Sequence, residues 1–248
     1  MCSINMVIAQ ELTKSDHLKP NFVFILADDC TFRDIGIYGG QAYTPHIDQL
    51  AKEGMKFKRA FQTAPMCSPT RHTIYTGLYP VKSGAYPNHT FANDDVKSIV
   101  QYLKPMGYRV ALSGKAHIAP KSVFPFEYSN AIANYPEGSN SKPKRQNSPD
   151  FSAIEKLMSE SKENKNPFCL FVTSNQPHAP WDLGDSSRYP PEKLELASYY
   201  VDTKVTREEL SKYYAEITYF DDEVGRTLAL LKKYKYVYYL TKKNQNND

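Results

Sequence analysis

The segment from residue 64 to residue 77 reads APMCSPTRHTIYTG and places Cys67 shortly before Pro69 and Arg71. Proline suits the first turn of a helix, so we expect Cys67 at or just before a helix N-terminus, where backbone N–H groups and the helix dipole favour an anion. Arg71 adds a planar guanidinium that fits tetrahedral oxyanions. A lone cysteine is more often a buried, inert thiol, but these neighbours predict a sulfate or phosphate site.

Polar residues also follow three predicted strands, at the point where each strand ends. Residues 21–29, NFVFILADD, are an apolar run ending in two acids, which is typical of a central strand buried on both faces of a parallel sheet. Residues 108–112 and 167–174 are the other two strands. Ligands of parallel α/β sheets bind beyond the carboxyl ends of the strands, so we expect the polar side chains to converge there. These residues are Asp28, Asp29, Lys115, His117 and His178.

Asp28 and Asp29 are adjacent carboxylates directly after a strand. An isolated acid pair is more often a helix cap or a turn, but in this position it favours a hard divalent cation such as Ca²⁺ or Mg²⁺, which prefers oxygen ligands. His178 lies in the segment QPHAP, where a histidine beside proline is often only a turn residue. Its place after a strand favours a role in the site.

The alternation of strands and helices predicts an α/β fold with a mostly parallel central sheet and helices on both faces. Helices are expected at residues 44–54 and 96–103, after an N-cap at Ser148, and at residues 207–233, where apolar residues recur at helical spacing. Residues 118–147 are rich in Pro, Ser and Asn and are expected to form a long surface excursion.

The composition excludes several classes of protein. The 248 residues are 41% hydrophobic, which is enough for a globular core, and the net charge of +4 indicates neither a nucleic-acid-binding stripe nor a polybasic membrane patch. No apolar stretch approaches the roughly 20 residues of a membrane span. The four cysteines have neither metal-module nor disulfide-scaffold spacing. Residues 1–19 are expected to be a disordered start or the remnant of a signal peptide.

The segment from Cys67 to Arg71, followed by Thr76 and Gly77, resembles the C-x-P-x-R signature of the type I sulfatases, members of the alkaline-phosphatase-like superfamily. Thr70 stands where Ser is usual and keeps the hydroxyl. NFVFILADD, TPHIDQLAKEGMKFKRAF, SGKAH, QPHAPW and YYAEITYFDDEVGRTLALL resemble further family blocks in the same order, so the resemblance covers about residues 20–233. Within the family, the segment GKAHIAPKSVFPFEY resembles the corresponding segment of the sulfamidases, the N-sulfoglucosamine sulfohydrolases.

The resemblance implies a formylglycine mechanism. Cys67 would be oxidised to formylglycine by a formylglycine-generating enzyme, and one hydroxyl of the hydrated aldehyde would attack sulfur. The metal ligands carried over are Asp28, Asp29 and the modified Cys67, on Ca²⁺ or, as the second choice, Mg²⁺. The substrate would be a sulfated carbohydrate or another small sulfated molecule. Localisation would be periplasmic, secreted or lysosomal.

The resemblance also implies four further catalytic residues. Arg71 and Lys115 would neutralise negative charge at the diol and the sulfate. His117 would handle the proton of the diol. His178 would contact sulfate or protonate the leaving group, and the division of roles between the two histidines stays open.

Sulfatases continue beyond such a long helix with a strand that ends in Asp-Asn or Asp-His, then a lysine and a smaller subdomain. Residues 234–248 carry no such acid pair, so they are interpreted as an aberrant tail, and the catalytic domain as an incomplete sulfatase-like domain from a truncated or frameshifted protein. Two alternatives remain: an inactive sulfatase-like fragment or binding module, and a phosphate or phosphonate ester hydrolase of the same superfamily.

Several polar residues near these motifs are not expected to be catalytic. Asp221 and Asp222 fall on the polar side of the helix at 207–233 and are expected to be solvated or paired. His46 and His72 match no catalytic position of the family. Asn88 begins an Asn-His-Thr glycosylation sequon.

Overall fold

The computed structural model describes residues 19–129 and 148–236. Four strands form one parallel sheet in the order β1-β4-β2-β3; the sequence predicted the parallel arrangement but not this order. Their bounds are β1 Phe22–Leu26, β2 Arg109–Gly114, β3 Glu127–Tyr128 and β4 Phe168–Thr173. Three expectations fall wholly or partly outside the described residues: the start at residues 1–19 except residue 19, the surface excursion from residue 130 to 147, and the tail from residue 237 to 248.

This part of the chain also contains six α-helices and five short 3-10 helices. The α-helices are α1 Pro45–Glu53, α2 Cys67–Thr76, α3 Pro80–Ser83, α4 Ile99–Leu103, α5 Phe151–Glu163 and α6 Lys204–Lys233. The 3-10 helices are Phe32–Asp34, Gly36–Tyr38, Lys104–Met106, Ser186–Arg188 and Pro191–Lys193. Within the described ranges, no helix is both long and apolar enough to cross a membrane.

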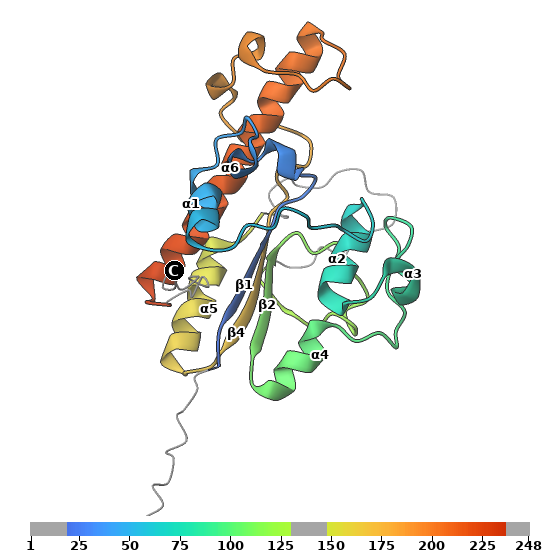
Figure 1. Cartoon of the computed structure of the whole chain (residues 1–248). Coiled ribbons are helices and arrows are strands. Elements are labelled where there is room, and N and C mark those ends of the chain that lie inside the picture. Colours follow the sequence, from blue (N-terminus) through green and yellow to red (C-terminus); the bar gives the residue numbers. More distant parts are fainter. Residues whose placement is uncertain (1–18, 130–147, 237–248) are drawn as a thin grey trace, which may run out of the picture.

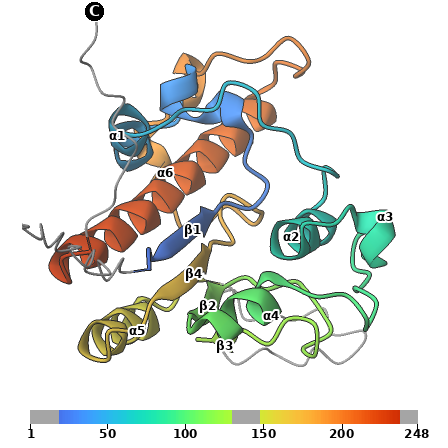
Figure 2. The same ribbon diagram turned by 60° about the horizontal axis from the view of Figure 1, so that its bottom comes forward.

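Helices cover both faces of the sheet, with α2 and α4 on one side and α5 and α6 on the other (Figures 1 and 2). Side chains alternate along a strand, so β2 contributes Val110 and Leu112 to the cluster that includes Tyr75 of α2, and Ala111 to the cluster beneath α5. β4 is buried at every position, because it is flanked by strands and covered on both faces. This arrangement matches the predicted α/β class.

Local capping signals explain where three helices begin. α4 starts after Ser98, whose capping box includes the side chain of Gln101. α6 starts after Thr203, whose hydroxyl accepts from the N–H of Thr206. For α5 the N-cap is Asp150, which accepts from two backbone N–H groups, so the prediction of Ser148 was wrong by two residues.

The structure corrects two further predictions. β1 was expected to be a central strand buried on both faces, yet it is the edge of the described sheet, and Phe24 is 39% exposed. Residues 118–129 were expected at the surface, yet Phe124 and Phe126 are buried and the segment ends in β3. Apolar packing of these aromatic rings against Tyr75 and Phe171 outweighs the turn-rich composition.

Asp221 was expected to be solvated or paired on the polar side of α6, and it is paired but completely buried. Its carboxylate accepts from the backbone N–H groups of His46 and Ile47, at 3.0 and 2.8 Å. These groups belong to the first turn of α1, where helical N–H donors have no partner within the helix. Asp221 therefore caps α1 and joins it to α6, while Asp222 is exposed.

Candidate active site

Three strand ends meet at one edge of the sheet. The strand register places Leu26 of β1 and Gly114 of β2 on either side of Thr173 of β4. Gly114 has a φ of +105°, and a Cβ there would lie 2.0 Å from the carbonyl oxygen of Thr173, so only glycine fits this approach. The N–H of Lys115 then donates to the same carbonyl at 2.8 Å, which fixes the start of the loop that carries His117.

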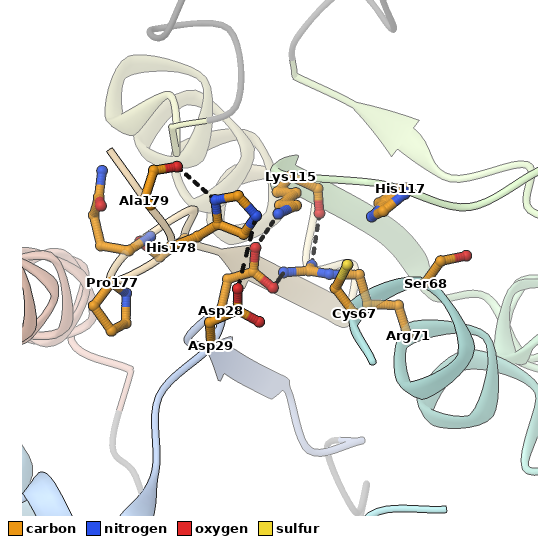
Figure 3. A network of polar contacts seen from close by, with 12 residues as sticks. Asp28, Asp29, Cys67, Ser68, Arg71, Lys115, His117, Pro177, His178 and Ala179 are labelled. Carbon is orange, nitrogen blue, oxygen red and sulfur yellow. Dashed lines mark hydrogen bonds and ion pairs between the residues drawn. The ribbon is translucent and has the colours of Figure 1, made fainter. Parts of the chain in front are cut away.

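Asp28 is at the centre of a buried charged group (Figure 3). Its carboxylate is 4% exposed and pairs with Arg71, whose Nη2 lies 3.5 Å from Oδ1, and with the ammonium of Lys115. Nη1 of Arg71 also donates to the carbonyl oxygen of Lys115 at 2.8 Å. One buried anion thus holds two cations from different elements in a fixed arrangement.

Cys67 is the first residue of α2, as Pro69 predicts, and Arg71 lies one turn further along the same helix. The hydroxyl of Thr70 donates to the carbonyl oxygen of Ala64 at 2.6 Å, so threonine supports the turn before the helix. Four residues therefore lie where the sequence predicts, around the N-terminus of α2: Asp28, Cys67, Arg71 and Lys115 (Figure 3).

His178 lies on the loop after β4, beside the predicted metal ligand Asp29. Its Nε2 is 3.7 Å from a carboxylate oxygen of Asp29, and its Nδ1–H donates to the carbonyl oxygen of Ala179 at 2.6 Å. Both side chains are partly exposed, which leaves them accessible to a ligand. The structure therefore brings His178 to the site, next to Asp29.

His117 is a titratable group of the site whose pKa is strongly shifted. Burial, followed by the charges of Lys115, His89 and Arg71, lowers the pKa of His117 to about 3. The ring is therefore neutral at physiological pH. Its Nε2 lies 2.9 Å from Nδ1 of His89.

The sequence analysis missed Asn88 and His89 as parts of the site. Oδ1 of Asn88 accepts from the backbone N–H of Ser68 at 3.2 Å and lies 3.6 Å from Sγ of Cys67. The sequon thus contributes a half-buried side chain that faces Cys67. A signal was available, because two polar residues follow Pro87 in the loop beyond the C-x-P-x-R helix, but the sequon offered a competing interpretation.

Tyr213 of α6 is a second missed neighbour. Its hydroxyl donates to a carboxylate oxygen of Asp34 at 3.0 Å and lies 3.4 Å from the carbonyl oxygen of Asp29. Its ring packs edge-on against Trp181, close to His178 in the chain. Tyr213 therefore links the loop after β1 to the loop after β4.

Comparison with known proteins decides the family. The family model described as Sulfatase matches residues 20–239. The chain belongs to the sulfatase family. An ulvan-active sulfatase of Formosa agariphila is 32% identical over 224 residues, which cover 87% of this chain and 42% of the relative. The human N-sulphoglucosamine sulphohydrolase is 32% identical over 164 residues, which cover 64% of this chain and 32% of the relative.

The fold agrees with this assignment. The crystal structure of yidJ from Bacteroides fragilis superposes with a TM-score of 0.69 at 24% sequence identity, over 93% of this chain and 61% of the other. The sulfatase chain described here spans less than half the length of the two curated relatives. His46 and His72 stay outside the charged group, and His72 is fully buried against Phe124.

Sulfatases generally depend on formylglycine and a divalent cation. Asp28 and Asp29 offer the oxygen donors that a hard cation prefers. Both oxygens of Asp28 already contact cationic side chains, however, and residues 19–129 and 148–236 contain no group of three or more His, Cys, Asp or Glu that could hold a metal. These residues alone do not complete a metal site.

Proposed function

We propose that this chain carries the nucleophile half of a sulfatase active site, and that the protein hydrolyses a sulfate ester or N-sulfate through formylglycine at residue 67. The observation that carries the proposal is the position of Cys67 at the N-terminus of α2, beside the buried cations Arg71 and Lys115. Helix N–H groups and two fixed cations favour a tetrahedral oxyanion over a neutral ligand.

The chemistry proceeds in two steps. One hydroxyl of the hydrated aldehyde loses its proton to water and forms a bond to sulfur while the bond from sulfur to the leaving group breaks, and the leaving group takes a proton from His178. The second hydroxyl then loses its proton to water, and its oxygen forms the C=O bond of the aldehyde while the C–O bond to the sulfate group breaks. Arg71 and Lys115 stabilise the negative charge that develops on the sulfate oxygens.

His178 is proposed as the proton donor to the leaving group. Its Nδ1–H is held by the carbonyl oxygen of Ala179, so Nε2 is the nitrogen that can exchange a proton, and Nε2 lies 3.7 Å from a carboxylate oxygen of Asp29. The partial exposure of His178 suits contact with a departing sugar hydroxyl. His117 is linked to Asn88 through His89, and Asn88 lies beside Cys67, so His117 is assigned to hydrogen bonding with the hydroxyls of residue 67.

A sulfated carbohydrate is the proposed substrate class. Two curated relatives support this choice, because one is named for ulvan and the other for N-sulphoglucosamine. The resemblance also implies Ca²⁺ or Mg²⁺, with Asp28, Asp29 and the modified Cys67 as ligands. A cation there would polarise the sulfate group.

The decisive experiment co-expresses the chain with a formylglycine-generating enzyme and follows the Cys67 peptide by mass spectrometry. The converted chain is then assayed in parallel with an aryl sulfate, an aryl phosphate and N-sulfated and O-sulfated glucosamine, with and without Ca²⁺. We expect sulfate release from the wild type and none from Cys67→Ala. A fully converted chain that releases no more sulfate than Cys67→Ala, at any Ca²⁺ concentration, would refute the proposal; preference for aryl phosphate would favour a phosphoesterase.

A further inference from the structure

Four groups near Cys67 form a continuous chain of hydrogen bonds. The backbone N–H of Ser68 lies 3.2 Å from Oδ1 of Asn88, and Nδ2 of Asn88 lies 3.3 Å from Nε2 of His89. Nδ1 of His89 lies 2.9 Å from Nε2 of His117. The other ring nitrogen of His117, Nδ1, is inaccessible to solvent and has no hydrogen-bond partner among the described residues.

The donor and acceptor of each hydrogen bond in this series follow from the first hydrogen bond. A backbone N–H only donates, so the atom of Asn88 that it meets is the carbonyl oxygen, and the other end of the amide is the NH₂ group. That NH₂ group donates to Nε2 of His89, which must accept. A neutral imidazole carries one proton, so His89 carries it on Nδ1 and donates it to Nε2 of His117.

The same rule then applies to His117. Its Nε2 accepts, so the neutral ring carries its proton on Nδ1. Burial together with Lys115 and Arg71 keeps the ring neutral, because these effects lower the pKa of His117. The ring therefore has a buried N–H donor with no acceptor among the described residues, which is unfavourable unless a ligand supplies one.

The backbone supports a functional origin for this pairing. His89 and His117 both have positive φ, 67° and 50°, a region that non-glycine residues seldom occupy. Such conformations persist where the surrounding structure requires them, and they concentrate at active sites. Here they bring together two rings from loops that are 28 positions apart in the chain.

We propose that the Ser68–Asn88–His89 relay fixes His117 as an Nδ1–H donor, and that His89 is a positioning residue of the site. The acceptor would be an oxygen on residue 67 or on the sulfate group, an assignment that rests on the proposed function. A ring in this state stabilises an ionised hydroxyl by donating to it. It cannot take up the proton of that hydroxyl at Nδ1, in contrast to the role that the resemblance implies for His117.

The test reads the tautomer of His117 directly. The full chain is labelled with ¹⁵N-histidine, and two-bond ¹H–¹⁵N spectra distinguish protonated from unprotonated ring nitrogens; single His→Gln variants assign the six histidines. In the wild type we expect a protonated Nδ1 and an unprotonated Nε2 for His117. In His89→Phe, which removes the donor and keeps a ring, we expect the proton to shift toward Nε2.

The control variant is His46→Asn, because His46 is exposed and outside the relay. It should leave the spectrum of His117 unchanged. In the converted chain, His89→Phe should lower kcat roughly 10- to 100-fold, the range for groups that orient a functional histidine, whereas His46→Asn should not. Circular dichroism checks that each variant is folded.

The outcomes separate this proposal from the proposed function. A wild-type His117 protonated on Nε2, or a tautomer unchanged in His89→Phe, would overturn the relay even if the chain is active. The expected tautomers in a chain without turnover would support the relay and count against the proposed function. A change in kcat without a change in tautomer would also overturn the relay.

Discussion

Replacing Asp28 with asparagine should destabilise the chain severely. The substitution keeps the shape of the side chain but removes the charge that holds Arg71 and Lys115, which are 3% and 7% exposed. At the 3.5 Å separation of Arg71 Nη2 and Asp28 Oδ1, an effective dielectric of about 20 gives an attraction of roughly 5 kcal/mol. The desolvation of the two cations persists in the variant, so we expect a loss of about 3–5 kcal/mol of unfolding free energy.

Urea unfolding in the presence of a chelator measures this loss without interference from a cation. Fluorescence of Trp181, the one tryptophan of the chain, reports the transition because its ring packs against Tyr213. Asp222→Asn is the matched control, since Asp222 is exposed on α6 and its substitution should change stability by less than about 0.5 kcal/mol. A loss below about 1 kcal/mol for Asp28→Asn would refute the argument that this carboxylate neutralises both cations.

Three further predictions concern the framework around the site. Asp221→Ala leaves two backbone N–H groups without acceptors, so urea unfolding should show a loss of about 2–5 kcal/mol, against a negligible loss for Asp222→Ala; equal losses would contradict the capping role. Burial raises the pKa of Glu223 to about 7, so the stabilisation from its protonated form is complete below about pH 4.5 and disappears as the pH rises through 7. Urea unfolding between pH 4.5 and 7 should show the unfolding free energy fall by about 3 kcal/mol in the wild type and stay constant in Glu223→Gln. Identical pH profiles of the two proteins would contradict this role of Glu223. Gly114→Ala should lose roughly 2–4 kcal/mol, because the new Cβ meets the carbonyl oxygen of Thr173, and an unchanged urea midpoint would show that the strands relax freely.

Local chemistry accounts for much of what was predicted correctly. Continuous apolar runs identified β1 and β4, and the periodicity of α6 identified a helix whose bounds, Lys204–Lys233, differ from the prediction by three residues at one end. Pro69 placed Cys67 at a helix N-terminus, and the rule for parallel strands placed Asp28 and Lys115 at one edge of the sheet. Each of these signals lies within a short window of sequence.

The failures concern what one segment finds when it packs against another. β1 has the composition of a central strand, but its neighbours determine whether both of its edges are paired. Asp221 lies on the polar side of its helix, yet α1 packs there and supplies two N–H donors. The periodicity of a helix indicates which residues share a face and leaves open what covers that face.

The sequence by itself determined the family and the α/β class, and it predicted the candidate site residues, because these follow from motifs and from the ends of recognisable strands. The candidates are Asp28, Asp29, Cys67, Arg71, Lys115, His117 and His178. Tertiary structure alone decided which of them touch. It joined Asp28 to two cations and His117 to His89, and it brought Asn88 to Cys67. Such contacts depend on how the loops at the edge of the sheet lie relative to one another. Packing between segments that are distant in the sequence sets the positions of these loops, and a local sequence pattern does not predict that packing.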